Sequence, residues 1–323
     1  DALRRLMLSD QDISELDRLW NELHYISRDA LSLVDAFDQL WQYATQDADP
    51  SAFEPLRKPI VERAAAFRET LLQSEPEHLN AICGIASKAF RRPLLIAEEQ
   101  KLRSAYDKLR QSDLDHETAI RSLLTKVLIS PAFLYKSEKG TGEIKTIGDG
   151  TIAIRPLTDF ELATRLSYMI TGTLPDEELL SAAASGTLSD PAILKSQARR
   201  LLQSAGVRSI ANEFGCQWLH VYQFDTHDEK STESFPDFVG LRNSMYQESI
   251  LFWVELFRND YSLLNLLDAD YAFIDTTLAK HYGLDWDSAA PVEAPGFSDW
   301  RRVPQSIKFD RGGILTMASV LSK

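Results

Sequence analysis

The sequence predicts an all-α fold, a multi-helical array with at most one or two short strands. Three observations support this fold class. Apolar residues recur at helical spacing through most of the 323 residues, helix-capping residues and stop signals flank these segments, and short strands are predicted only at Ile152–Ile154 and near 300–303. Hydrophobic content of 44% with 26% charged residues is typical of a globular chain with a substantial core.

The segment 155–176 carries the clearest helix signal in the chain. Thr158 and Glu161 have the spacing of a capping box, and Gly172 is a stop signal. Glu161 and Arg165 are predicted to pair on the polar side, four residues apart. The predicted apolar face consists of Leu162, Leu166, Met169 and Ile170.

The chain is predicted to form two helical regions, 1–138 and 151–323, joined by a linker or hairpin loop at 139–150. Four glycines among polar residues indicate the connector, which lacks the motif of a phosphate-binding loop. In the first region, Ser74 is expected to open a new helix with Pro76 in its first turn. In the second, 207–222 is expected to be one helix bearing Ile210, Phe214, Trp218 and Val221 at helical spacing.

The segment 236–259 is predicted to be the longest and most central helix, because its second half is apolar almost all round. Glu248 and Glu255 lie seven residues apart and therefore on the same side of this helix. Two carboxylates beside an apolar surface are candidates for acid and base catalysis or for metal binding. The alternative is structural pairing with Arg242, Arg258 or another helix, which is the more frequent fate of buried carboxylates.

Further candidates for catalysis follow in 268–281. Asp270, Tyr271 and His281 would suit hydrolysis or divalent metal binding, although the EF-hand pattern is missing. Asp275 is better explained as the cap of a helix that Gly283 ends. His220 and His227 are alternatively metal ligands or helix-end residues, and the sequence predicts no metal or cofactor site in this fragment.

Composition restricts the partners. A net charge of −13 argues against nucleic acid, and no apolar run approaches the roughly 20 residues that span a bilayer. Cys83 and Cys216 lack the partners of a zinc or haem motif, so buried free thiols are expected, with a disulfide as the alternative in an oxidising compartment.

Five blocks resemble planctomycete-type domains of unknown function, which occur in large secreted proteins beside c-type cytochrome motifs. The blocks are AFRRPL (89–94), LISPAFLY (128–135), RPLTDFELATRLSYMITGTLPD (155–176), LLDADYAFIDTTLAKHYG (266–283) and RGGILTMASVL (311–321). The resemblance implies a periplasmic or secreted protein. It also implies haem c, if present, in a part of the full-length protein beyond Lys323, and it supplies no catalytic residues.

Two functions are therefore considered. The first is a helical scaffold or recognition module of a multidomain extracytoplasmic cytochrome-c-like protein, with a haem domain of the same polypeptide, a redox partner or a polysaccharide as its partner. The alternative is an enzyme, either a redox component completed by that haem domain or a carboxylate-dependent hydrolase acting on polysaccharide. An open cleft lined by Glu248, Glu255 and Asp270 would favour the enzyme.

Overall fold

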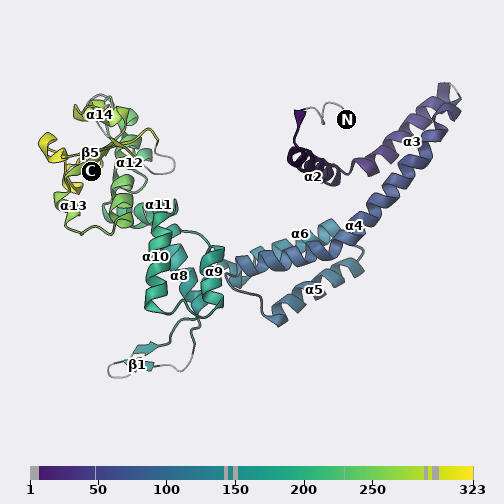
Figure 1. Ribbon diagram of the computed structural model, residues 1–323, viewed down its shortest axis with the longest axis horizontal. Coiled ribbons are helices and arrows are strands. Elements are labelled where there is room, and N and C mark those ends of the chain that lie inside the picture. Colours follow the sequence, from purple (N-terminus) through teal and green to yellow (C-terminus); the bar gives the residue numbers. More distant parts are fainter. Residues whose placement is uncertain are drawn as a thin grey trace. The chain divides into compact units, whose positions relative to one another are not determined.

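The computed structural model describes residues 7–47, 49–141, 145–147, 152–228, 230–286, 290–292 and 298–322, and it is mainly helical, as predicted (Figure 1). Its contacts divide the chain into two compact units, unit 1 (1–86 and 95–127) and unit 2 (87–94 and 128–323). The boundary at 139–150 stays a prediction, and residues 142–144 and 148–150 lie outside the described part. No helix in the described ranges is long and apolar enough to cross a membrane.

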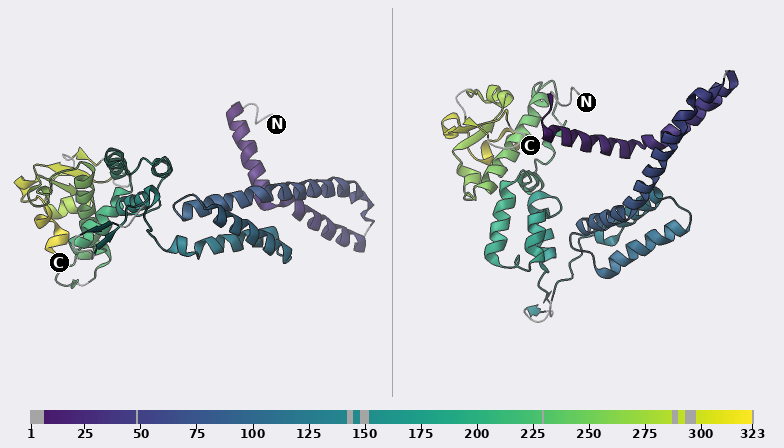
Figure 2. Two further views of the ribbon diagram at one scale, coloured as in Figure 1. Left: turned by 90° about the horizontal axis from the view of Figure 1, so that it is seen from below. Right: turned by 45° about the vertical axis from the view of Figure 1, so that its right-hand side comes forward.

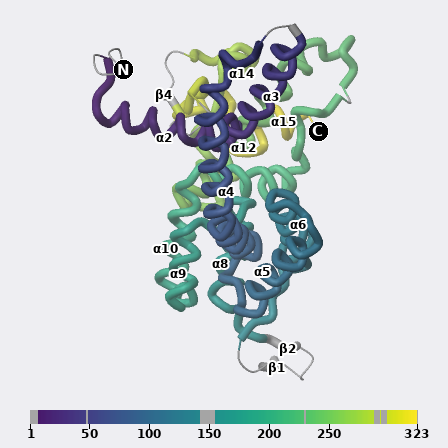
Figure 3. The backbone as a smooth tube through the Cα atoms, turned by 90° about the vertical axis from the view of Figure 1, so that its right-hand side faces the viewer, coloured from purple at the N-terminus to yellow at the C-terminus, as the bar shows by residue number. Residues whose placement is uncertain are grey.

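Unit 1 is built from five helices and one 3₁₀ turn in the described residues. They are α2 (Asp10–Ser27), α3 (Asp29–Asp47), η1 (Pro50–Phe53), α4 (Glu54–Ala89), α5 (Ile96–Gln111) and α6 (His116–Leu128). Helices α5 and α6 run alongside the C-terminal half of α4 (Figures 1 and 3). Leu102 and Leu123 are among the buried residues between them.

Helix α4 is the longest described helix, with 36 residues, whereas the sequence predicted a new helix at Ser74. Pro76 lies inside α4 without ending it, although an interior proline removes one backbone donor and its ring crowds the preceding turn. Tertiary hydrogen bonds hold this part of α4 from both sides. Tyr25 of α2 reaches Ser74 at 2.8 Å, and Tyr106 of α5 donates to Glu75 at 3.1 Å.

Unit 2 begins with α7 (Pro131–Leu134), a hairpin of β1 (Lys145–Ile147) and β2 (Ile152–Ile154), and three helices that lie side by side: α8 (Asp159–Thr171), α9 (Glu177–Ala184) and α10 (Pro191–Gln203) (Figures 1 and 3). Next come α11 (Val207–Ile210), a π-helix η2 (Ala211–Cys216), η3 (Phe224–Thr226) and α12 (Phe238–Arg258). The remaining elements are α13 (Asn265–Asp268), β3 (Tyr271–Ile274), α14 (Thr276–Tyr282), β4 (Ala290–Pro291), β5 (Arg301–Pro304), η4 (Ser306–Phe309), η5 (Ile314–Thr316) and α15 (Ala318–Leu321).

The described residues contain five short strands, more than the one or two that the sequence predicted. All pairings are antiparallel: β1 with β2, and a second sheet in the order β3–β5–β4, in which Tyr271 lies opposite Pro304. Strands of two to four residues bury little surface by themselves. The second sheet is held by its packing against α12, through β3.

The caps of α8 are those predicted, but its buried face and its ion pairs differ from the prediction. Thr158 and Glu161 form the capping box, and Gly172 ends the helix with a φ of 68°. Met169 is exposed, and the buried side consists of Ala163, Ser167 and Ile170. Glu161 does not pair with Arg165, because its carboxylate accepts backbone hydrogens from Lys139, Gly140 and Thr158. Arg165 instead pairs with Glu138 at 2.6 Å.

Helix α12 passes through the core of unit 2, with β3, α14 and α15 packed against it (Figure 2). It has 21 residues, of which 13 are buried, and it is shorter than α4 with 36, so the prediction that it is the longest helix is wrong. Its Trp253 is 2% exposed and lies against the backbone of Gly215 in the π-helix. A Cβ atom at position 215 would come within 2.5 Å of the indole ring, closer than atoms in real structures approach.

We expect Gly215→Ala to destabilise unit 2, lowering the free energy of unfolding by about 1–3 kcal/mol, because the added methyl group overpacks the contact with Trp253. Gly84→Ala is the matched control, since Gly84 lies inside α4 with no atom within 4 Å of its would-be Cβ. There the same change should add about 0.5–1 kcal/mol through helix propensity. Urea unfolding followed by circular dichroism measures both, and equal effects of the same sign would contradict the packing argument.

Candidate functional site

Glu248 lies in the middle of α12 and is only 3% exposed. Tyr282, the last residue of α14, donates its hydroxyl hydrogen to Oε2 of Glu248 at 2.7 Å. The same hydroxyl oxygen accepts from the backbone N–H of Ala318 at 3.1 Å. Arg311 lies over the Tyr282 ring at 4.0 Å and donates to the carbonyl of Thr316 at 2.6 Å. Tyr282 therefore links three segments that are distant in sequence.

The environment of Glu248 favours its neutral form. Burial raises the pKa of Glu248 to about 8, and the hydrogen bond from Tyr282 and the positive charge of Arg311 only partly oppose this increase. Burial and the nearby Glu248 charge also raise the pKa of Tyr282. A carboxyl group with this pKa is mostly protonated at neutral pH, which is a property of many catalytic acids.

The space around Glu248 is too small for a substrate. A cavity of about 10 Å³, the size needed for a single water molecule, adjoins the carboxyl group. Its lining residues are Glu248, Phe252, Tyr271, Ala272, Phe273, Arg311, Gly312, Gly313, Thr316 and Met317. The two glycines close it, since a Cβ at Gly312 would lie 2.5 Å from the carbonyl oxygen of Ala269. In this arrangement Glu248 contacts only the protein interior.

The other predicted candidates do not converge on this cavity, except for Tyr271. Glu255 forms an ion pair with Arg302 at 3.2 Å, and the Arg302 guanidinium lies 4.3 Å from the centre of the Tyr271 ring. Burial, with the negative charge of Glu255, raises the pKa of Tyr271 to about 12, so this phenol stays protonated. Asp270 is exposed and accepts from the backbone N–H of Ile307 at 3.2 Å. His281 is exposed, with its ring against Tyr282.

The expected helix cap and free thiols are present. Asp275 accepts from the backbone N–H of Leu278 at 2.7 Å, and Gly283 ends α14 with a φ of 68°. Cys83 and Cys216 are free and buried, and burial raises the pKa of Cys216 to about 12, which makes its thiol unreactive. Across the described residues no three His, Cys, Asp or Glu side chains are grouped so that they could hold a metal ion.

Sequence reasoning missed a histidine pair in unit 1. Nδ1 of His78 in α4 lies 2.9 Å from Nε2 of His116 in α6, and the Tyr106 hydroxyl lies 2.7 Å from the other nitrogen of His116. Burial is the main cause that lowers the pKa of His116. The two residues are 38 positions apart in sequence, so no local spacing signals the pair, which joins α4, α5 and α6.

A second feature that sequence reasoning missed is an exposed aromatic pair in unit 2. Phe214 and Trp218 are 54% and 55% exposed, although both keep the spacing of the predicted helix 207–222. The observed segment contains the π-helix η2, which changes the helical phase before Trp218. Both rings meet Trp253 edge-on, with centroid distances of 6.1 and 5.9 Å. We call Phe214 and Trp218 the aromatic surface.

Polar side chains in fixed positions adjoin the aromatic surface along the chain. The Glu213 carboxylate accepts hydrogen bonds from Asn212 at 3.0 Å, Gln217 at 3.1 Å and Tyr222 at 3.3 Å. Tyr246 of α12 donates its hydroxyl hydrogen to the Asn212 side-chain oxygen. Apolar rings and oriented amide and carboxylate groups thus lie on the same short segment.

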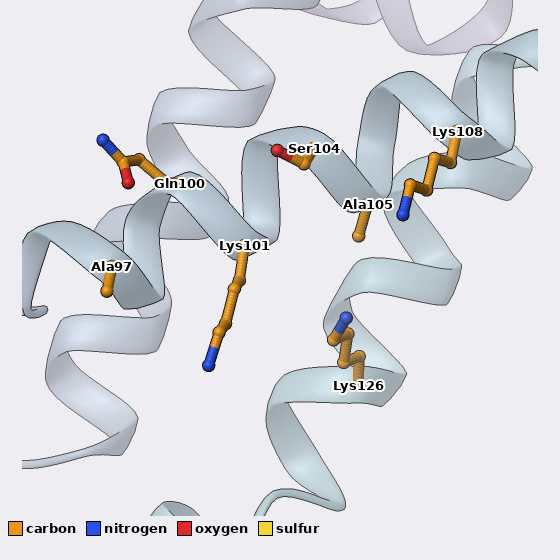
Figure 4. A pocket seen from close by; sticks show the side chains of 7 residues that line it. All are labelled: Ala97, Gln100, Lys101, Ser104, Ala105, Lys108 and Lys126. Atoms are coloured by element: carbon orange, nitrogen blue, oxygen red, sulfur yellow. The ribbon is translucent and has the colours of Figure 1, made fainter.

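A third feature is a hollow between α5 and α6 of unit 1, with a volume of about 400 Å³ (Figure 4). It is lined by Ala97, Gln100, Lys101, Ser104, Ala105, Lys108 and Lys126. Lys101 and Lys108 extend from α5 toward the side on which Lys126 rises from α6 (Figure 4). We call this hollow the lysine groove.

We expect Glu248→Gln to flatten the pH dependence of stability. Between about pH 4.3, the unfolded pKa, and about pH 8, the folded chain holds a proton on Glu248 that the unfolded chain releases. The free energy of unfolding therefore falls as the pH rises through this window, by at most about 1.4 kcal/mol per pH unit for one proton. Glutamine keeps an acceptor for Tyr282 and removes this proton. Urea unfolding at several pH values gives the free energy of unfolding as a function of pH, and its slope is compared between wild type and Glu248→Gln.

Glu248→Ala is the control for that measurement. It should flatten the slope equally and also lower stability by about 1–3 kcal/mol relative to Glu248→Gln, because Tyr282 loses its acceptor. Identical pH slopes in wild type and Glu248→Gln would show that the carboxyl group is ionised in the folded chain.

Comparisons with known families match two parts of the chain. PSD4, described as Protein of unknown function (DUF1592), matches residues 157–284, and PSD5, described as Protein of unknown function (DUF1595), matches residues 78–138. No curated protein and no solved structure matches the chain.

The PSD4 match includes Glu248, Tyr282 and the aromatic surface, and the PSD5 match includes the lysine groove. The predicted resemblance is thus confirmed for these two families. Residues 78–138 thus match PSD5 and residues 157–284 match PSD4, two families of unknown function.

Proposed function

We propose that this chain is a helical recognition module that binds polysaccharide through the aromatic surface. The observation that carries the proposal is that Phe214 and Trp218 are half exposed while both rest on the buried Trp253. Exposed apolar side chains that adjoin one another are characteristic of interaction sites. Isolated exposed aromatics would not support the proposal in the same way.

The aromatic surface is held rigidly. Trp253 supports both rings from below, and it is itself fixed by the Gly215 backbone and by stacking on Phe257 at 5.5 Å. Rings that are already ordered lose little conformational entropy when a ligand binds. Tryptophan and phenylalanine also offer a large contact area with few rotatable bonds.

The chemistry of this segment suits a sugar. Pyranose rings have apolar C–H faces that pack on aromatic rings, and hydroxyl groups that need hydrogen-bond partners at their edges. Glu213 offers a carboxylate acceptor, while Asn212 and Gln217 each offer an amide. Their mutual hydrogen bonds orient them before a ligand arrives, which favours a hydroxyl-rich ligand over a purely apolar one.

The surroundings of the carboxylates support recognition over hydrolysis. A hydrolase acting through Glu248 needs room for a sugar beside the carboxyl group, and the adjoining cavity has a volume of about 10 Å³. Glu255 is paired with Arg302, so it is not free to act as the second carboxylate. A glycosidase needs two carboxyl groups facing one substrate.

The biological setting that we propose follows from the resemblance described above. The module would serve as a scaffold in a multidomain extracytoplasmic protein of cytochrome-c type, with haem c in a domain outside these 323 residues. Its partners would be that haem domain or a redox partner, together with the polysaccharide. The family resemblance is the only support for this setting.

We expect Trp218→Ala and Phe214→Ala each to weaken retention on insoluble polysaccharides by about tenfold or more, as for central aromatic contacts in other interfaces. The measurement is the fraction of protein bound to cellulose, chitin, xylan and mannan suspensions. Phe235→Ala is the matched control, because Phe235 is 58% exposed and lies outside the aromatic surface. Thermal unfolding should change little in all three variants.

Two results would overturn the proposal. Retention of Trp218→Ala and Phe214→Ala at the level of wild type would show that the aromatic surface does not bind the polymer. Release of reducing sugar by wild type, lost in Glu248→Gln, would establish the hydrolase instead.

A further inference from the structure

We propose that the lysine groove is a binding site for a small phosphate-bearing anion. The site lies in unit 1, whereas the aromatic surface lies in unit 2, so the two proposals are independent.

The shape of the lysine groove suits a small molecule. Six lining residues come from α5, at positions 97, 100, 101, 104, 105 and 108, and this spacing places them on one face of that helix. Ala97, Ser104 and Ala105 have short side chains, which leaves open space between the longer ones (Figure 4). The volume of about 400 Å³ lies within the range of small-molecule sites, about 300–1,000 Å³.

The charges at the lysine groove are not neutralised by the protein. In the part of the chain that the structure describes, Lys101, Lys108 and Lys126 form no ion pair with a carboxylate. The arginines of α5 differ in this respect. Arg103 pairs with Glu99 at 2.7 Å, and Arg110 pairs with Glu75 at 3.2 Å.

Three ammonium groups that line one hollow repel one another, and an anion bound among them lowers this repulsion. The chain as a whole is acidic, with 48 acidic and 35 basic residues, so a local excess of positive charge is unusual in it. A hollow that gathers three unpaired lysines on a chain with a net charge of −13 is complementary to a multivalent anion.

Lysine is a common ligand of phosphate. Each ammonium group presents three N–H donors as a compact charge, whereas arginine forms bidentate pairs with phosphate and carboxylate alike. Gln100 and Ser104 add neutral donors to the same lining. A long polyanion would meet Glu98, Glu99 and the overall negative charge of the chain, so the ligand is small.

Isothermal titration calorimetry with inorganic pyrophosphate, on the whole chain at low salt, tests this assignment. We expect saturable binding with one site per chain, weakened about fivefold by Lys101→Gln and about fivefold by Lys126→Gln, the loss typical of one exposed charge contact. Lys58→Gln is the matched control, because Lys58 is an exposed lysine of the same unit outside the groove. Its affinity should equal that of wild type.

A second measurement locates the ligand. Pyrophosphate should protect Lys101, Lys108 and Lys126 from acetylation, as read by mass spectrometry, and should leave Lys58 reactive. Citrate and sulfate, at equal ionic strength, should bind at least about fivefold more weakly than pyrophosphate if phosphate is recognised.

Several outcomes would overturn the assignment. They are a titration that does not saturate, a loss of pyrophosphate affinity in Lys58→Gln as large as in the groove variants, and unchanged affinity in both Lys101→Gln and Lys126→Gln. Citrate or sulfate binding as tightly as pyrophosphate would also contradict it. Duplex DNA binding more tightly than pyrophosphate would replace the small ligand with a polymer. Trp218→Ala should bind pyrophosphate as wild type does, so failure here is distinguishable from failure of polysaccharide recognition.

Discussion

The contact between the Trp253 ring and the backbone of Gly215 holds α12, in the core of unit 2, against the segment that carries the aromatic surface. Because position 215 has no side chain, the π-helix approaches α12 closely enough for the indole to lie against its backbone. The extra residue in the π-helical turn changes the direction in which later side chains point. Phe214 and Trp218 consequently face solvent on either side of the contact, with Trp253 beneath them.

Glycines close the region around Glu248 in the same way. At Gly312 and Gly313 a Cβ atom would lie 2.5 and 2.6 Å from carbonyl oxygens of the segment 266–269. This close approach allows Arg311 to reach both the Tyr282 ring and the Thr316 carbonyl. A buried carboxyl group, a tyrosine and an arginine resemble catalytic machinery in composition, yet their packing leaves space for about one water molecule. Composition and raised pKa alone therefore do not identify an active site.

Local signals in the sequence predicted local structure well. The caps at Thr158 and Asp275 and the stops at Gly172 and Gly283 depend on residues within one helical turn, and all four are present. Predictions failed where distant segments decide the outcome. Helix α4 continues through Pro76, where residues of α2 and α5 form hydrogen bonds with Ser74 and Glu75. Met169 is exposed, although its spacing fits the predicted apolar face.

The candidate sites were harder to predict than the helices. The partners of Glu248 and Glu255 are Tyr282 and Arg302, 34 and 47 residues away, and no spacing rule connects such positions. The lysine groove likewise needs Lys126 of α6 to meet α5. Gly215 was the one available signal for the π-helix, since a glycine inside a predicted helix often marks close packing.

The edge-on contact of Trp218 with Trp253 also has a photophysical consequence. Two indole rings whose centres lie 5.9 Å apart are close enough to exchange excitation energy, and here one ring lies in the core and the other is half exposed to water. A molecule that covers Trp218 changes the environment of this indole, so tryptophan emission is an intrinsic optical reporter of the aromatic surface.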